Sequence, residues 1–195
     1  MKYITSLLFI FICSTFNYIF PQQIPSQKEK PALLVIDIQN GYLPIMDAAE
    51  MKQVIKAIPS VIKLFHARGL PVIRVYHTDP ERGPRPGENG FEFPGDIPSE
   101  ASDIKVIKTR PSAFEKTELE NILRKAGCNT LYLCGLSMTG CVYATYQEAD
   151  HLALNPFIID KFVTSHSAPK TKEFQSRCRT ITYAEIEKRL HDATQ

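Results

Sequence analysis

Three residues of this sequence carry the side chains of a nucleophile, a base and a cation, and each stands beside a strand-like segment. Cys141 lies in the stretch 135–145, between a strand-like run and a helix-like run. Asp37 stands near the end of one buried-strand pattern, and Lys108 ends another. A thiol needs a base to take its proton and a cation to favour its thiolate. Together these residues predict a nucleophilic cysteine.

Each residue also has a structural explanation when it is considered alone. Cys141 could be a small packed thiol at a tight turn, because cysteine is among the most often buried residues. Asp37 could cap the turn that follows it, and a lysine at a strand end is most often solvated. The chemical interpretation predicts that the start of a helix lowers the thiol pKa of Cys141. It also predicts that burial raises the carboxyl pKa of Asp37, with a neighbouring ammonium opposing the shift.

The segments that must position these residues alternate between strand patterns and helix patterns. The expected strands are 31–38, 71–76, 104–107, 130–134, 156–160 and 179–181. The expected helices are 48–68, 117–126, 141–149, part of 164–176, and a last one capped by Thr182 and Glu185. This order predicts an α/β fold: a doubly wound, mainly parallel six-stranded sheet with helices on both faces. Ligands bind such sheets beyond the carboxyl ends of the strands.

The longest segment without periodicity runs from His77 to Asp103 and is rich in glycine and proline. A loop of this length in a compact domain is usually a lid or a binding loop, with a solvated decoration as the alternative. Arg82 and Arg85 lie in it and could meet a substrate carboxylate, although loop arginines more often face solvent. We expect substrate specificity to depend on this loop.

The chain has 195 residues, enough for one well-filled core, and a formal net charge of +2. Because the basic residues are scattered, we expect a small-molecule partner and no nucleic acid. Residues 1–27 are expected to be a signal peptide or N-terminal membrane anchor plus linker, with the apolar residues 3–20 as the membrane tether. The folded domain, expected over 28–195, is then secreted or periplasmic, or held at a membrane by an uncleaved anchor.

Four cysteines follow the N-terminal segment, at Cys128, Cys134, Cys141 and Cys178. They show neither CxxC pairing nor the histidine spacing of a zinc site. If Cys141 stays free, an oxidising compartment permits at most one disulfide among the other three, and the pairing is open. A thiol-redox protein is a further alternative, although no resolving cysteine stands close in sequence to Cys141.

Over residues 32–190 the sequence resembles the isochorismatase-like cysteine hydrolases, a family that includes nicotinamidases and N-carbamoyl amide hydrolases. The resemblance is carried by Leu-Val-Ile-Asp37-Ile-Gln39-Asn40, by Lys108-Thr-Arg-Pro-Ser112-Ala113-Phe114, and by Gly135-x5-Cys141-Val142-x-x-Thr145. It implies the isochorismatase-like hydrolase fold and a homo-oligomer.

The resemblance also implies a role for each residue of these motifs. Asp37 is expected to be the base, Lys108 its electrostatic partner and Cys141 the nucleophile. A cis peptide between Leu136 and Ser137 is implied, with the N–H groups of Ser137 and Cys141 as an oxyanion hole. Candidates for lining the substrate pocket are Gln39, Phe114 and Tyr143, with core packing an equal alternative for Phe114.

The expected activity is that of a metal-independent amidohydrolase, which cleaves a C–N bond of a small amide, ureide or carbamoyl compound through a Cys-thioester. Nicotinamidases of the family bind a metal through an Asp-x-His type cluster, whereas His77-Thr78-Asp79-Pro80 contains no second histidine. We therefore expect no metal and no cofactor. Isochorismatases proper lack the cysteine, so Cys141 argues against cleavage of a vinyl ether. Met138 stands where the family usually has a threonine. This substitution favours the alternative function, a non-catalytic relative that binds a ligand or a partner chain.

Overall fold

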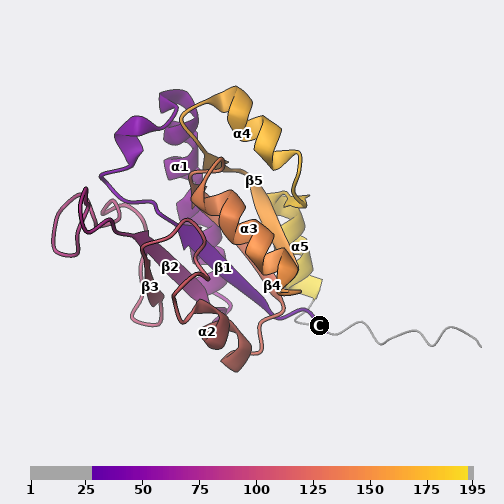
Figure 1. The fold of residues 1–195 in the computed structure, drawn as a ribbon. Helices are drawn as coiled ribbons and strands as arrows, with labels where there is room; N and C mark the ends of the chain where they lie inside the picture. The colour runs from indigo at the N-terminus through magenta and orange to yellow at the C-terminus, as the bar shows by residue number, and fades with distance from the viewer. Residues whose placement is uncertain (1–27, 193–195) are drawn as a thin grey trace, which may run out of the picture.

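The computed structural model describes residues 28–192, which fold around a single six-stranded sheet (Figure 1). The strands are β1 Pro31–Ile36, β2 Val72–His77, β3 Ile104–Lys108, β4 Thr130–Leu136, β5 Pro156–Thr164 and β6 Thr180–Ile181. The helices are η1 Leu43–Ile45, α1 Ala48–His66, α2 Leu119–Lys125, α3 Cys141–His151, α4 Ala168–Gln175 and α5 Tyr183–Asp192. The expected signal or anchor lies outside the described residues. Within them, no helix combines the length and the hydropathy needed to cross a bilayer.

The strands lie in the order β3-β2-β1-β4-β5-β6, and every neighbouring pair is parallel. The predicted doubly wound sheet is thus confirmed, and it is wholly parallel rather than mainly so. The chain builds outward from β1 through β2 to β3, then starts again on the other side of β1 with β4. This reversal leaves a crevice at the carboxyl ends of β1 and β4, which is where such sheets bind ligands.

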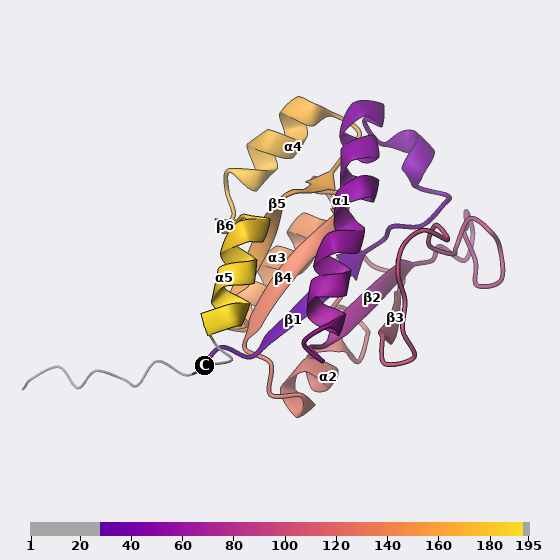
Figure 2. The ribbon, with the colours of Figure 1, turned by 180° about the vertical axis from the view of Figure 1, so that it is seen from behind.

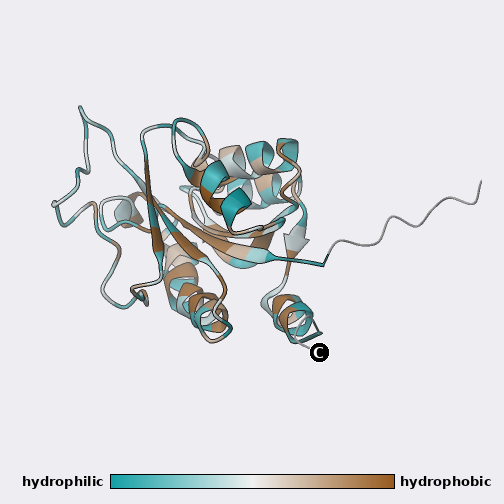
Figure 3. Ribbon diagram, turned by 90° about the horizontal axis from the view of Figure 1, so that it is seen from below, coloured by the Kyte–Doolittle hydropathy of each residue, from teal (hydrophilic) through white to brown (hydrophobic). Residues whose placement is uncertain are grey.

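Helices cover both faces of the sheet (Figures 1 and 2). Residues of α1 and α5 belong to one apolar core, and residues of α2 and α3 belong to the core on the opposite face. All residues of β1 and β4 are buried, in agreement with their uninterrupted apolar sequences. Viewed along its edge, the sheet is an apolar layer between the helices (Figure 3).

The two strands that flank the crevice approach each other closely at Gly135. The φ angle of Gly135 is 116°, and a Cβ built there would lie 2.0 Å from the carbonyl oxygen of Ile36. Only glycine fits this position, because any side chain would collide with the backbone of β1. Gly135 therefore sets the spacing between the strand that precedes Asp37 and the loop that precedes Cys141.

A capping box closes the start of α5 but not the start of α2. At α5, Thr182 and Glu185 form the predicted capping box, with the two reciprocal bonds at 2.8 and 3.2 Å. At α2, Thr117 and Glu120 have the same spacing, but the N-cap residue is Glu118 and no capping box forms. The Glu120 carboxylate instead accepts a 2.7 Å hydrogen bond from Arg124, one turn along the helix, which draws it away from the N-terminus.

Candidate active site

The structure brings the side chains of Asp37, Lys108 and Cys141 together at the carboxyl edge of the sheet. Asp37 directly follows β1, Lys108 is the last residue of β3, and Cys141 is the first residue of α3. The Lys108 Nζ lies 2.8 Å from the Asp37 Oδ2. A carboxylate oxygen of Asp37, a ring nitrogen of His77 and the Cys141 Sγ all lie within 4.8 Å of one another.

Asp37 is a buried carboxylate with one paired oxygen and one free oxygen. It is 3% exposed, and its Oδ1 has no hydrogen-bond partner among the described residues. Burial raises the pKa of its carboxyl above the ordinary value of 3.8, and the Lys108 ammonium opposes this shift. Both directions agree with the expectation from the sequence. The free oxygen is the one able to accept a proton from a neighbouring group.

The thiol of Cys141 differs from the expectation. Burial and the negative charge of Asp37 raise its pKa to about 12, and the Lys108 ammonium lowers it by less. The favourable effect of a helix N-terminus is therefore outweighed, because the sulfur is largely desolvated beside an anion. Near neutral pH the resting sulfur is a thiol, so any nucleophilic attack must be coupled to proton transfer.

The loop between β4 and α3 presents two backbone N–H groups next to this thiol. The Leu136–Ser137 peptide is cis, as the resemblance implied. The N–H of Met138 donates to the Thr164 carbonyl at 2.8 Å, and the Ser137 carbonyl accepts from Val142 at 3.1 Å. Within residues 28–192, the N–H groups of Ser137 and Cys141 donate no such bond. Both N–H groups are therefore available to a bound group.

A cavity of about 340 Å³ opens beside the thiol. Its volume suits a small molecule rather than a chain segment. Its walls are formed by Asp37, Tyr42, Met46, His77, Asp79, Arg82, Gly83, Leu136, Ser137 and Cys141. Four of these side chains, Tyr42, Met46, His77 and Asp79, were not assigned from the sequence. They stand in segments without periodicity, where only the folded chain shows which side chains turn inward.

The three residues expected to line the pocket are not among the residues that form the walls of this cavity. Gln39 is fully buried, and its amide is bonded to the backbone of His77. Phe114 is 7% exposed and packs in the core against α2 and α3. The ring of Tyr143 packs edge-on against Phe174, with 5.0 Å between the ring centroids. Apolar packing therefore accounts for both aromatic residues, and hydrogen bonding within the fold accounts for Gln39.

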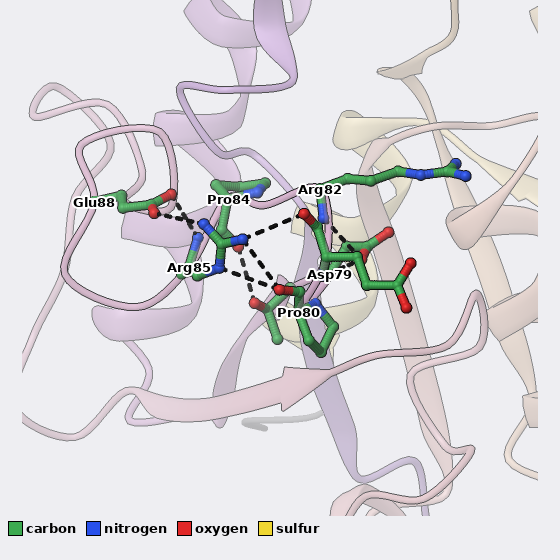
Figure 4. A network of polar contacts seen from close by, with 8 residues as sticks. Asp79, Pro80, Arg82, Pro84, Arg85 and Glu88 are labelled. Carbon is green, nitrogen blue, oxygen red and sulfur yellow. Dashed lines mark hydrogen bonds and ion pairs between the residues drawn. The ribbon is translucent and has the colours of Figure 1, made fainter.

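The two loop arginines, Arg82 and Arg85, make different contacts. The guanidinium of Arg85 donates to the carbonyl of Pro80 at 3.1 Å and to the Glu88 carboxylate at 3.3 Å, and so closes the turn (Figure 4). The Arg82 side chain extends away from this network (Figure 4). Arg82 is one of the residues that line the cavity. Of the two, Arg82 alone is placed to meet a bound molecule.

Side chains of metal-binding types do meet in this site. Asp37, His77 and Cys141 each offer one ligand atom at close range. The Lys108 Nζ, however, lies 2.8 Å from Asp37 Oδ2 and 3.2 Å from His77 Nδ1. A buried ammonium in contact with two of three ligands repels a divalent cation, so this donor set does not fit a metal. The absence of a catalytic metal stays a prediction.

The described cysteines are all free thiols. Cys128, Cys134 and Cys178, among which one disulfide was considered, form none in this structure. Cys134 is fully buried and lies 3.6 Å from the Leu34 carbonyl. Among these four residues, Cys141 alone lines the cavity beside Asp37.

Comparison with known proteins identifies relatives along most of the chain. The sequence model of the Isochorismatase domain matches residues 31–182. The isochorismatase family protein YecD of Escherichia coli O157:H7 is 32% identical over 152 residues, which cover 70% of this chain and 81% of YecD. The ureidoacrylate amidohydrolase RutB of Acinetobacter baylyi is 25% identical, over 66% of this chain and 68% of RutB.

A solved structure has the same fold. The N-carbamoylsarcosine amidase from Thermoplasma acidophilum superposes with a TM-score of 0.69 and 28% identity, over 78% of this chain and 95% of that one.

Proposed function

The chain belongs to the isochorismatase family of hydrolases, and we propose that it is a metal-independent cysteine hydrolase acting on a C–N bond of a small amide, ureide or carbamoyl compound. The observation that carries the proposal is the shared position of the Cys141 thiol and the half-paired carboxylate of Asp37. Two relatives are named for hydrolysis of ureidoacrylate and N-carbamoylsarcosine, and their names support the ureido or carbamoyl class.

The first step joins proton transfer to attack. Because the resting sulfur is a thiol, Asp37 takes the proton on its free Oδ1 while Cys141 Sγ forms a bond to the substrate carbonyl carbon. The carbonyl oxygen becomes an oxyanion, held by the N–H groups of Ser137 and Cys141. Lys108 stays charged throughout and offsets the negative charge that moves from Asp37 to the substrate.

The second step expels the nitrogen and regenerates the thiol. The protonated Asp37 gives its proton to the departing amine or ammonia as the C–N bond breaks, which leaves a thioester on Sγ. A water molecule then attacks the thioester carbon, and Asp37 accepts one proton from that water. The C–S bond breaks, the sulfur regains the proton from Asp37, and the acid product leaves.

The test is a screen for ammonia release from small amides, ureides and carbamoyl compounds. We expect turnover with the wild-type protein and none with Cys141→Ala, with the same melting profile. Cys178→Ala is the matched control, because Cys178 is also a partly buried free thiol but lies outside the cavity. Full activity of Cys141→Ala would end the proposal. No turnover on any compound would favour a non-catalytic binding protein.

A further inference from the structure

His77 lies in the site, but the proposed mechanism gives it no task. It is the last residue of β2, which lies between β1 and β3 in the sheet. Lys108, paired in register with His77, must pass the end of β2 to reach Asp37 beyond β1. On this path its Nζ comes within 3.2 Å of the His77 Nδ1.

The chemistry of the two groups decides which one donates. A lysine ammonium has three N–H donors and no acceptor, so the Nδ1 of His77 must carry a lone pair. The imidazole is then neutral, with its proton on Nε2. Burial and the Lys108 ammonium lower the pKa of His77, while the carboxylates of Asp37 and Asp79 and the backbone of Arg110 act in the opposite direction.

The backbone of His77 is itself held by Gln39. The His77 N–H donates to Gln39 Oε1 at 2.7 Å, and Gln39 Nε2 donates to the His77 carbonyl at 2.9 Å. Gln39 is fully buried and stands two residues after Asp37. The segment after β1, the end of β2 and the end of β3 are thus joined in a closed ring of polar contacts.

The Lys108 side chain needs such support. It is fully buried, and its flexible stem permits several positions for the ammonium. Asp37 Oδ2 fixes one of its three N–H donors, and His77 Nδ1 fixes a second from a different strand. These two contacts, made from different sides, restrict the position of the ammonium more than the contact with Asp37 would without His77.

We infer that His77 is a positioning residue, whose neutral Nδ1 holds the Lys108 ammonium against Asp37 and beside Cys141, and that Gln39 fixes the backbone of His77 for this task. The effect of His77 on turnover rests on the proposed function. The effect of His77 on the reactivity of the Cys141 thiol does not, because the Lys108 charge favours the thiolate of Cys141 whether or not a substrate is known.

Three variants of His77 separate an acceptor from mere bulk. His77→Asn places an amide oxygen the same number of bonds from Cβ as Nδ1, His77→Gln places it one bond further out, and His77→Leu removes it. We expect His77→Leu to lower kcat about tenfold or more with little change in KM, as loss of an outer support does. His77→Asn should recover much of this loss, and His77→Gln should stay closer to His77→Leu. His151→Leu, at the exposed end of α3, is the control.

Alkylation by iodoacetamide tests the inference without a substrate. Near neutral pH, Cys141 should react more slowly in His77→Leu than in His77→Asn, at equal thermal stability. Equal rates in these two folded variants would overturn the inference, as would equal kcat. If the wild-type protein turns over none of the compounds, the proposed function fails while the order of the alkylation rates still decides the role of His77.

The tautomer supplies a second measurement that is independent of activity. In protein with ¹⁵N-labelled histidine rings, the His77 signals are those that vanish in His77→Asn. At neutral pH we expect a neutral ring with its proton on Nε2. A proton on Nδ1, or a doubly protonated ring, would show that Lys108 does not donate to His77 and would overturn the inference.

Discussion

Replacing Lys108 with methionine keeps the length of a fully buried side chain and removes its charge. Asp37 then loses its ion-pair partner, and both of its oxygens are left buried without the ammonium. Removing one partner of a buried ion pair typically costs about 3–5 kcal/mol of unfolding free energy when the other partner stays charged. Asp37 can avoid part of this cost by binding a proton, so the loss of stability must depend on pH.

The sign of this pH dependence follows from the direction in which the fold shifts the pKa of the Asp37 carboxyl. In the wild-type fold the pKa of Asp37 is already raised above 3.8, so the carboxyl contributes stability at low pH that is lost as pH rises. The Lys108 ammonium opposes this rise, so Lys108→Met raises the pKa of Asp37 in the folded state further. The pH range over which the fold loses stability becomes wider as a result. Each additional pKa unit removes about 1.4 kcal/mol at a pH above the folded value.

The assay is urea unfolding across acid to neutral pH for wild type, Lys108→Met, Asp37→Asn and the double variant. We expect Lys108→Met to be close to wild type just above pH 3.8 and progressively less stable towards neutrality. At neutral pH the double variant should be about 2–4 kcal/mol more stable than Lys108→Met, because it buries no unpaired charge. A pH-independent loss, or a double variant no more stable than Lys108→Met, would refute the reasoning.

Four further predictions follow from the site and its supports. Cys141 should react with iodoacetamide faster than the fully buried Cys134, and peptide mapping measures the two rates. Gly135→Ala should lower the unfolding free energy by about 3 kcal/mol or more, because its Cβ would meet the β1 backbone; thermal unfolding measures this. Arg82→Gln should raise KM for substrates with a carboxylate and leave KM for neutral ureides such as hydroxyethylurea unchanged, as steady-state kinetics can show. Incubation with EDTA followed by gel filtration should leave the rate of ammonia release unchanged.

The sequence was sufficient to predict the sheet and the meeting of three site residues. Uninterrupted apolar runs mark β1 and β4 as buried parallel strands, and parallel strands bring their carboxyl ends to one edge. Asp37, Lys108 and Cys141 each stand at such an end, so their proximity follows from the fold class. The distances between these residues do not follow from the fold class, because those distances depend on the order of the strands in the sheet.

The errors concern side chains whose direction the pattern does not determine. The resemblance made Gln39 a candidate for lining the pocket, whereas its amide is hydrogen-bonded to the backbone of His77. The pKa of Cys141 was expected to fall because the residue begins a helix. Whether burial or the helix terminus prevails depends on the solvent that reaches the sulfur, and that quantity exists only in the folded chain.

The order of the strands explains why the site needs a fourth residue. Asp37 directly follows β1, and Cys141 begins the helix that follows the adjacent strand β4, at the point where the sheet reverses its direction of growth. The proposed base and nucleophile therefore meet without a long reach. Lys108 comes from β3, and β2 separates it from that point. A cation delivered from two strands away must cross the intervening strand end, and the residue found there is His77. An acceptor at that position gives the buried ammonium a second contact beside the one with Asp37, which an apolar residue would not supply.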